Sequence, residues 1–371
     1  MRSRPLLSLR RPRWRRLAPI LLTATLAIWG GWQVYDAAQV PLPTSDRSLI
    51  IAVQPRAVPF EEILLQAIES ATTSIQVDVY RCSAPRITQA LLEAHQRGVE
   101  VDVQVDQDQW SGCPPSIRSF VKGRRRGRHG LYHPKSLIVD DHLCWVGSAN
   151  FTPSGLQDQA NLLLGVDDVD AAHAVHDLLH GGSASSWKRT IAEHEVAFYR
   201  LPGPAFYPAL IKALSEAKHD IKVAMFVLTH VGLLQALEKA CFRGILVEIL
   251  LNEPPSTPDA RALLKRLNTL GGSVRIYPSH EMLHAKACWI DRHLLVGGSS
   301  NWTKSAFKRN FELAFIVTTP LSSEQAQLEA WWNWIWARGR PMERREPPKH
   351  LYLTVDRLVG QEGGRALPCT R

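Results

Sequence analysis

The sequence predicts an α/β fold: two tandem α/β/α sandwich domains, related by a pseudo-two-fold axis, behind an N-terminal transmembrane helix. Three observations lead to this fold class. Strand and helix patterns alternate from Leu49 onward, the same pattern returns 146 residues later, and an uncharged, mostly apolar segment at residues 17–35 follows a cluster of arginines. With 371 residues, the chain is long enough for two domains of ordinary size and further segments.

The first half is expected to alternate strands with amphipathic helices. The apolar spacing gives strand, helix, strand, helix and strand at residues 50–53, 60–71, 75–80, 87–97 and 99–105. Short connections between such elements imply parallel strands in a mixed sheet with helices on both faces. A hairpin, a strand at 160–166 and a helix at 169–179 close this half.

The second half repeats the first. A shift of 146 residues reproduces the pattern of helix, strand, helix and strand at residues 206–217, 221–228, 233–243 and 245–251. A hairpin, a strand at 312–317 and a helix at 322–336 close this half as well. We therefore expect an internal duplication rather than two unrelated domains.

The strongest pattern is a motif that occurs twice. It reads HPKSLIVDDHLCWVGSAN from His133 to Asn150 and HAKACWIDRHLLVGGSSN from His284 to Asn301. The residues that match without a gap are His133, Lys135, Asp140, Gly147, Ser148 and Asn150 in the first copy and His284, Lys286, Asp291, Gly298, Ser299 and Asn301 in the second. Any one of these residues alone is more often structural than functional. Six residues that recur at the same spacing in two copies indicate a functional site.

Each motif copy is expected to form a tight hairpin. Two short apolar runs flank Asp140, Asp141 and His142 in the first copy. Alternation along a strand sends His133 and Lys135 to the same face, and the hairpin returns the serine and the asparagine beside them. Each copy therefore predicts one cationic face rich in hydrogen-bond donors, and two related halves would bring the two faces together.

These two copies resemble the paired HKD motifs of the phospholipase D superfamily, and the resemblance covers nearly all of residues 49–337. It implies one active site shared across the interface of two phospholipase D-like domains. It also implies that His133 is the nucleophile, that His284 is the general acid and base, and that Asp140 and Asp291 fix their hairpins rather than react.

The family also tends to carry a glutamate eleven residues after the motif asparagine, where it orients a histidine across the site. Glu312 fits this position in the second copy, but the first copy has Asn161 there. This departure leaves open which histidine a carboxylate supports. It does not affect the expected reaction class.

The residue types suit cleavage of a phosphodiester. One neutral imidazole can attack phosphorus while the other protonates the departing alcohol, and a second step then breaks the phosphohistidine. Lys135, Lys286, Asn150 and Asn301 are placed to hold the phosphate oxygens as negative charge builds. Since these donors do what a metal does elsewhere, we expect no cofactor and no metal, and the sequence has no metal-ligand spacing or glycine-rich phosphate loop.

The basic character of the chain belongs mainly to its N-terminus. The formal net charge is +9, but seven arginines and no acidic residue lie in the first sixteen residues, which leaves +2 for the rest. Arginines before an apolar segment of this length predict a signal-anchor helix with a cytoplasmic N-terminus and a catalytic body on the extracytoplasmic side, periplasmic or extracellular. A cleaved signal peptide is the alternative.

The predicted organisation has six parts. These are a basic cytoplasmic segment at 1–16, the transmembrane signal-anchor at 17–35, a linker at 36–48, the first phospholipase D-like domain at 49–182, the second at 190–337 and a C-terminal tail at 338–371. Both motifs lie in one chain, so we expect a monomer.

Three substrate hypotheses stand. The first is hydrolysis of phospholipid headgroup diesters by a membrane-anchored phosphodiesterase. The alternatives are a metal-independent endonuclease acting on DNA or RNA, and a phosphatidyl transferase of the cardiolipin-synthase kind. A basic run before the first motif could follow a nucleic-acid backbone or bind anionic lipid headgroups, and a solvated loop is the favoured interpretation: Lys122, Arg124, Arg125, Arg126 and Arg128.

Two further groups of residues bear on the environment of the protein. A tryptophan run near the end of the second half fits either a membrane interface or packing on a core, and the second is favoured: Trp331, Trp332, Trp334 and Trp336. Cys144 and Cys288 are expected to be buried thiols. With an exported body, Cys82 and Cys113 are expected to pair as a disulfide, because each follows one of two neighbouring parallel strands.

Overall fold

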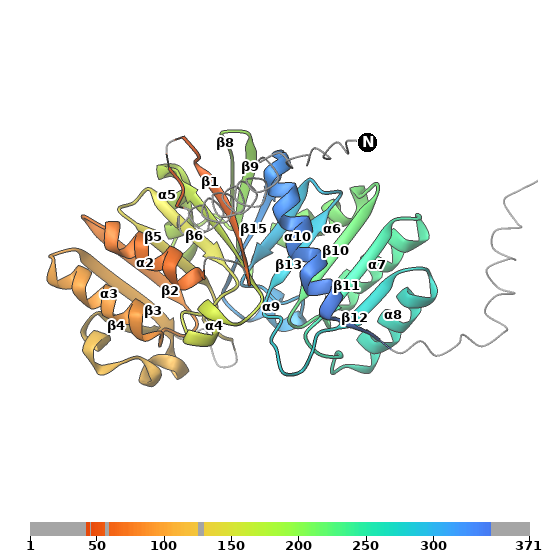
Figure 1. Cartoon of the computed structure of the whole chain (residues 1–371), viewed down its shortest axis with the longest axis horizontal. Coiled ribbons are helices and arrows are strands. Elements are labelled where there is room, and N and C mark those ends of the chain that lie inside the picture. Colours follow the sequence, from red (N-terminus) through yellow and green to blue (C-terminus); the bar gives the residue numbers. More distant parts are fainter. Residues whose placement is uncertain (1–41, 45, 56–58, 125–129, 343–371) are drawn as a thin grey trace, which may run out of the picture. The chain divides into compact units, whose positions relative to one another are not determined.

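The computed structural model describes residues 42–44, 46–55, 59–124 and 130–342 (Figure 1). The predicted basic segment, the predicted signal-anchor and most of the predicted tail therefore lie outside the described residues. Among the helices that are described, none combines the length and the apolar character needed to span a bilayer.

The first half forms a mixed seven-stranded sheet in the order β1-β7-β6-β5-β2-β3-β4. The strands are β1 (Leu49–Gln54), β2 (Ser74–Val79), β3 (Glu100–Asp106), β4 (Val121–Arg124), β5 (Lys135–Val139), β6 (Leu143–Gly147) and β7 (Asn161–Asp167). As expected, the strands that alternate with helices are parallel: β2 pairs with β3, and β3 with β4. The helices are α2 (Phe60–Ser70), α3 (Pro85–Gln96), α4 (Pro153–Gln157) and α5 (Val169–His180).

The second half forms a mixed nine-stranded sheet in the order β16-β12-β11-β10-β13-β14-β15-β9-β8. The strands are β8 (Ser186–Ile191), β9 (His194–Leu201), β10 (Asp220–Met225), β11 (Leu246–Leu251), β12 (Ser273–Ile276), β13 (Lys286–Ile290), β14 (Leu294–Gly298), β15 (Glu312–Thr318) and β16 (Arg340–Pro341). The helices are α6 (Phe206–Glu216), α7 (Val231–Phe242), α8 (Pro258–Thr269), α9 (Lys304–Lys308) and α10 (Ser322–Arg338). Figure 1 shows α2 and α3 beside the first sheet, and α7 and α8 beside the second.

The duplication includes a strand that the apolar pattern did not indicate. Strand β9 pairs antiparallel with β15, just as β1 pairs with β7, so a strand precedes the first repeated helix within the predicted second domain at residues 190–337. The run from His194 to Leu201 places Glu195 and Arg200 among apolar residues. This mixture hides the strand from a search for apolar runs.

Both motifs form the predicted hairpins. Strand β5 pairs with β6, and β13 with β14. The turns have two consecutive residues with positive φ, namely Asp140 (51°) and Asp141 (56°) in the first and Asp291 (52°) and Arg292 (55°) in the second. Two consecutive residues of positive φ are the signature of a type I′ turn, which matches the twist of the flanking strands.

The motif glycine is required where each hairpin ends. A Cβ atom at Gly147 would lie 2.3 Å from the carbonyl oxygen of Leu162, and one at Gly298 would lie 2.4 Å from that of Leu313. A side chain at either position would therefore push β7 or β15 away from the hairpin. This close approach places the serine that follows each glycine against the next strand.

The two halves share one hydrophobic core. A single cluster of buried residues includes Val146 and Leu162 of the first sheet together with Leu295, Leu313 and Phe315 of the second. Helix α10 adds a second connection, because the Trp331 indole donates to the carbonyl oxygen of Gln54 at 3.0 Å. The halves therefore pack as one body, and residues of one half can support the site of the other.

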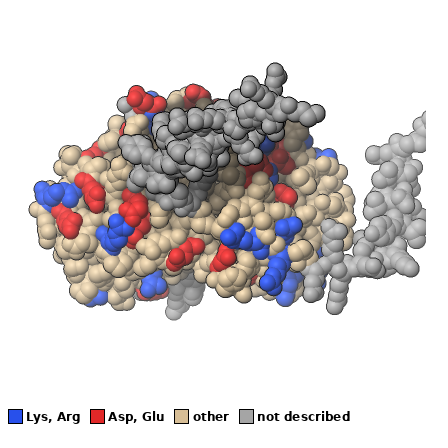
Figure 2. Space-filling model, in the orientation of Figure 1, with Lys and Arg blue, Asp and Glu red and all other residues tan. Residues whose placement is uncertain are grey.

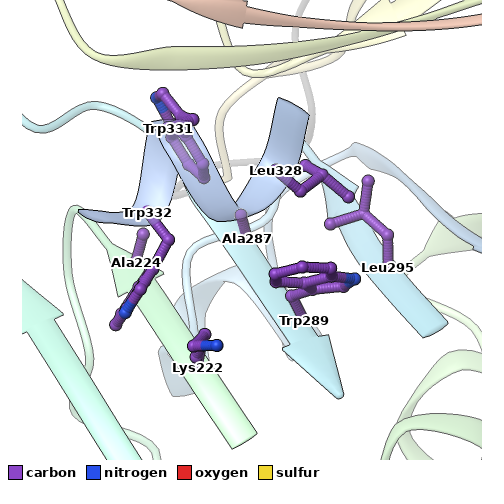
Figure 3. Close-up of a pocket in the computed structure, with 8 residues that line it drawn as sticks. All are labelled: Lys222, Ala224, Ala287, Trp289, Leu295, Leu328, Trp331 and Trp332. Carbon is purple, nitrogen blue, oxygen red and sulfur yellow. The ribbon is translucent and has the colours of Figure 1, made fainter. Parts of the chain in front are cut away.

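The tryptophan run of α10 packs on the core. Trp331 and Trp332 are buried, and Trp334 and Trp336 are partly buried against the shared core cluster. Figure 3 shows Trp331 and Trp332 above the sheet, where they line a small cavity of about 10 Å³ together with Trp289. These aromatic rings therefore cover the second sheet, which agrees with the favoured interpretation rather than with a membrane interface.

Candidate active site

The two motif histidines are held by backbone hydrogen bonds from opposite halves. The segment before β5 pairs with the segment before β15 through Tyr132 and Phe311, and the His133 N–H donates to the Phe311 carbonyl oxygen at 2.8 Å. In the second copy, the His284 N–H donates to the Ala160 carbonyl oxygen at 2.9 Å. Each half therefore fixes the main chain of the other half's histidine.

A carboxylate orients His133. Its Nδ1 lies 2.7 Å from Oε2 of Glu312, which is fully buried. The Ser299 hydroxyl donates to the same oxygen at 2.5 Å, and the Asn310 side-chain amide donates to Oε1 at 3.0 Å. Because an ionised carboxylate only accepts hydrogen bonds, Nδ1 carries the proton and Nε2 presents its lone pair to the site.

An amide takes the place of the carboxylate beside His284. Its Nδ1 lies 3.2 Å from Oδ1 of Asn161, which also accepts from the Ser148 hydroxyl at 2.7 Å. The Asn161 NH₂ group donates to the Gly155 carbonyl oxygen at 3.0 Å, so the amide oxygen faces the histidine. The departure in the sequence is thereby explained: the carboxylate supports His133, and a neutral amide supports His284.

The two motif lysines are almost fully buried. Lys135 donates to the carbonyl oxygen of His133 at 2.7 Å, and Lys286 donates to that of His284 at 2.5 Å. Burial lowers the pKa of Lys135 to about 7, although Glu312 and Asp106 oppose this shift. Burial and the charge of Lys135 lower the pKa of Lys286 well below its usual value. Both lysines therefore lack a carboxylate partner strong enough to offset their burial.

The histidines also favour their neutral forms. Burial lowers the pKa of His133, partly offset by Glu312. Burial lowers the pKa of His284 well below its usual value, and Lys286, Lys135 and His133 lower it further. Because Lys286, Lys135 and His133 all act on His284, the four groups lie near one another, and an anion bound among them would favour their charged forms.

Two aromatic residues of the site were not foreseen. The Tyr80 ring lies 5.3 Å from the His133 ring, and the Lys135 ammonium lies 5.6 Å from the Tyr80 centroid. The Phe226 ring lies 5.0 Å from that of His284, and Lys286 lies 4.8 Å from the Phe226 centroid. Tyr80 directly follows β2 and Phe226 directly follows β10, the parallel strand beside the motif hairpin in each half, and the shift of 146 residues relates them. An aromatic residue repeated at this shift was the signal available in the sequence.

The motif asparagines differ from each other. The Asn301 side-chain oxygen accepts from the Val227 N–H at 3.2 Å. The Asn150 side-chain oxygen is buried and has no hydrogen-bond partner among the described residues. The structure therefore anchors the second asparagine to the loop after β10, and the first lacks an equivalent bond.

The motif aspartates lie at the hairpin turns. The Asp140 carboxylate accepts from the backbone N–H groups of Thr72, Thr73 and Ser74 at 2.8, 2.8 and 3.0 Å. Burial favours a higher pKa for this carboxyl, but these hydrogen bonds outweigh it and hold the pKa below its usual value.

The second aspartate repeats the arrangement. Asp291 accepts from the N–H groups of Lys218, His219 and Asp220 at 2.8, 2.7 and 3.0 Å. Each aspartate thus ties its hairpin to the loop before the neighbouring parallel strand.

The predicted disulfide is absent. Cys82 and Cys113 are both buried free thiols, and the Cys113 thiol bonds to the main chain of Cys82. Cys82 pairs with Phe151 in an isolated bridge. Burial, and to a smaller extent the nearby Cys113, raises the pKa of the Cys82 thiol. Cys144 and Cys288 are buried free thiols, as expected.

The basic run is only partly described. Lys122 is exposed and pairs with Asp102 at 3.0 Å, and Arg124 lies 3.3 Å from Nδ1 of His180. Residues 125–129 lie outside the described part of the chain. On the face drawn in Figure 2, basic and acidic side chains are interspersed.

Comparisons with known proteins find a matching sequence profile and several similar proteins. The sequence profile described as "Cardiolipin synthase, PLD-like domain" matches residues 64–180 and 210–336, one segment in each half. "Cardiolipin synthase B" of Salmonella typhi is 27% identical over 278 residues, which cover 62% of this chain and 65% of that protein. The chain therefore spans somewhat less than two thirds of the length of this relative.

A second relative and a solved structure also match. "Mitochondrial cardiolipin hydrolase" of Homo sapiens is 33% identical over 110 residues, which cover 28% of this chain and 44% of that protein. The solved structure of phosphatidylserine synthase from Haemophilus influenzae Rd KW20 superimposes with a TM-score of 0.63 at 14% identity, covering 86% of this chain and 95% of that one. At this identity, the likeness shows a common fold.

Proposed function

We propose that this chain, which belongs to the phospholipase D superfamily, transfers a phosphatidyl group from one alcohol to another, as a cardiolipin synthase does. The sequence analysis put hydrolysis of headgroup diesters first and transfer among the alternatives. The matches to cardiolipin synthases in both halves favour the transfer. One observation carries the chemistry: two histidines from different halves meet in one electropositive site, and only one of them has a carboxylate partner.

In the first step, His133 attacks the phosphorus of a phospholipid. Nε2 forms the P–N bond while the bond from phosphorus to the headgroup oxygen breaks. Glu312 stabilises the positive charge that grows on His133 as its lone pair is used. His284 donates a proton to the departing alcohol. Its pKa must rise for this role, and the anionic phosphodiester bound between the lysines provides the negative charge that raises it.

In the second step, a new alcohol enters on the side that the first one left. His284 takes its proton, the alcohol oxygen attacks phosphorus, and the P–N bond to His133 breaks. If the alcohol is the glycerol hydroxyl of a second phosphatidylglycerol, the product is cardiolipin, and the alcohol released in the first step is glycerol. Water at this position would instead give phosphatidic acid, which is the hydrolytic alternative.

The lysines account for the stabilisation of charge. Both ammonium groups lie within the site, and burial makes them poorly solvated before substrate binds. Binding of an anion replaces the missing counter-charge. As phosphorus becomes five-coordinate, the growing charge on its oxygens is met by donors that need no rearrangement.

The proposal is tested with phosphatidylglycerol vesicles in the presence of EDTA. Lipid products are separated and identified by mass spectrometry. We expect cardiolipin and an equal amount of free glycerol. Turnover should persist in EDTA, because lysines and histidines supply the positive charge. Phosphatidic acid as the main product would establish hydrolysis instead, and cleavage of single-stranded DNA or RNA in place of lipid would establish the nuclease.

A further inference from the structure

Two exposed apolar side chains occupy equivalent positions beside the site. Leu131 is 37% exposed and Met282 is 39% exposed, which is unusual for large apolar residues in the described part of the chain. Each lies two residues before its motif histidine, and the shift of 151 residues that relates His133 to His284 also relates Leu131 to Met282. Single exposed apolar residues are common on protein surfaces. A pair repeated by the duplication at the same site calls for a functional explanation.

The backbone places each side chain on the same side as the motif histidine that follows it. The segments from Leu131 and Met282 are extended, because Tyr132 pairs with Phe311 and Leu283 with Ala160. In an extended chain, alternate residues point to the same side. Leu131 therefore shares the side of His133 and Lys135, and Met282 that of His284 and Lys286. The outermost residue on each side is apolar and exposed, whereas the inner two are polar and buried.

These positions are held firmly through the main chain. The carbonyl oxygen of Leu131 accepts from the Phe311 N–H at 2.7 Å, and that of Met282 accepts from the Ala160 N–H at 2.9 Å. The same two segments fix the histidines. The side chains of Leu131 and Met282 are thus left to face outward, and replacing them keeps these backbone bonds.

We propose that Leu131 and Met282 form an apolar rim that receives the glycerol-proximal acyl chains of a phospholipid while its phosphate lies between Lys135 and Lys286. The inference rests on the proposed function and names the feature that selects lipid. The order of groups along each segment is apolar, then histidine, then lysine. It matches an amphiphile whose apolar part adjoins an anionic diester. The two residues of extended chain from Leu131 to His133, or from Met282 to His284, span about 7 Å. This length suits the short glycerol unit between the phosphate beside the histidines and the acyl chains.

The rim makes a specific prediction about substrate preference. A nucleic acid or a soluble diester presents no acyl chains, so the rim should contribute little to its turnover. A phospholipid should lose the contact when the rim becomes polar. The informative quantity is therefore the ratio of kcat/KM on phosphatidylglycerol vesicles to kcat/KM on bis(4-nitrophenyl) phosphate, which a general loss of folding would not change.

The experiment compares the full-length wild type with Leu131→Ser, Met282→Ser and the double variant. We expect the ratio to fall at least tenfold in the double variant and by a smaller factor in each single variant. A variant that exchanges the two residues, Leu131→Met with Met282→Leu, keeps the rim apolar and should have the wild-type ratio. Phe242→Ser is the matched control, because Phe242 is 67% exposed at the end of α7 and lies outside the site; its ratio should equal that of the wild type.

The outcomes separate the two proposals. If the wild type consumes phosphatidylglycerol and the double variant keeps the wild-type ratio, the rim is wrong and the proposed function stands. A fall in the ratio for Phe242→Ser as large as that of the double variant would also refute the rim. If the wild type cleaves only the soluble diester, both the rim and the proposed function are wrong.

Discussion

At the scale of single residues, the site is symmetric in its main chain and asymmetric in its chemistry. The backbone N–H of each histidine donates to a carbonyl oxygen of the opposite half, yet Glu312 supports one imidazole and Asn161 the other. A carboxylate stabilises the positive charge that a histidine gains when it bonds to phosphorus, whereas an amide oxygen does so weakly. The asymmetry therefore favours His133 as the nucleophile.

Glu312→Gln tests this assignment. The substitution keeps the shape but removes the charge, so the rate of phosphohistidine formation should fall by about 10² to 10³. Asn161→Ala should lower the same rate by a smaller factor. Rapid-quench measurement of the covalent intermediate gives both rates, and His284→Asn should trap the phosphatidyl group on His133. Label recovered on His284 in a His133→Asn variant would reverse the roles.

The lysine with a pKa of about 7 gives a prediction for the pH profile. Burial lowers the pKa of Lys135, so its charged form is lost as pH rises through about 7 in the free enzyme. Since kcat/KM reports groups of the free enzyme, it should decline above about pH 7 on a soluble diester. Lys135→Arg stays charged in this range and should move the decline to higher pH at a lower maximum. A wild-type profile that stays flat to pH 9 would contradict the role of Lys135.

The sequence predicted which motif residues share a face better than it predicted their hydrogen-bond partners. Fixed spacing identified His133 and His284, because the hairpin brings residues close in sequence to one face. The pairing of His133 with Glu312 joins residues 179 positions apart, and only the packing of the two halves decides it. Cys82 and Cys113 show the reverse error: neighbouring strand ends suggested a disulfide, and both are buried free thiols.

At the scale of elements, the aspartate of each motif hairpin accepts hydrogen bonds from the loop before the neighbouring parallel strand. Asp140→Asn keeps a residue that tolerates the positive φ of this turn, but it replaces one acceptor oxygen by a donor facing N–H groups. We expect a loss of about 2 kcal/mol in the free energy of unfolding, the value typical of hydrogen bonds to a charged group. Denaturant unfolding measures it. Asp141→Asn, at the neighbouring exposed turn position, is the control and should change stability little.

The same variant should have a characteristic pH dependence. The native pKa of Asp140 is below its unfolded value, so its contribution is fully present above the unfolded pKa and is lost as pH falls through the native one. The stability difference between wild type and Asp140→Asn should therefore be constant above about pH 5 and shrink below about pH 4. A difference that grows as pH falls would refute the stated role.

Elements with strong apolar periodicity were predicted to within a few residues, for example α2 and β11. Elements whose outward face is charged were missed. Helix α8 carries Arg261, Lys265 and Arg266, and it was not foreseen because only one narrow side is buried, with Leu264 and Leu267. The short strand β12 follows it and depends on pairing with β11. Local pattern cannot reveal an element that tertiary contacts create.

At the scale of the whole molecule, the two halves share a core, a site and the helix α10. The buried cluster that joins the sheets contains Cys144 from the first half, while Cys288 lies in the core on the other side of the second sheet. Both thiols are free and buried. The reactivity of Cys144 therefore measures the unfolding of the first half, and that of Cys288 the unfolding of the second, without an introduced label.

The shared core predicts that both halves unfold in one cooperative transition. Brief exposure to a thiol reagent at increasing denaturant, followed by mass mapping, should give the same midpoint for Cys144 and Cys288. Trp331→Ala removes a buried side chain that bonds to Gln54 of the first half, at a cost of about 3 to 5 kcal/mol. Because α10 belongs to the second half and packs on the first, this variant should lower both midpoints equally. A wild type in which one cysteine becomes reactive well before the other, or a variant that shifts Cys288 alone, would show that the halves are independent domains and that the site assembles from separately stable parts.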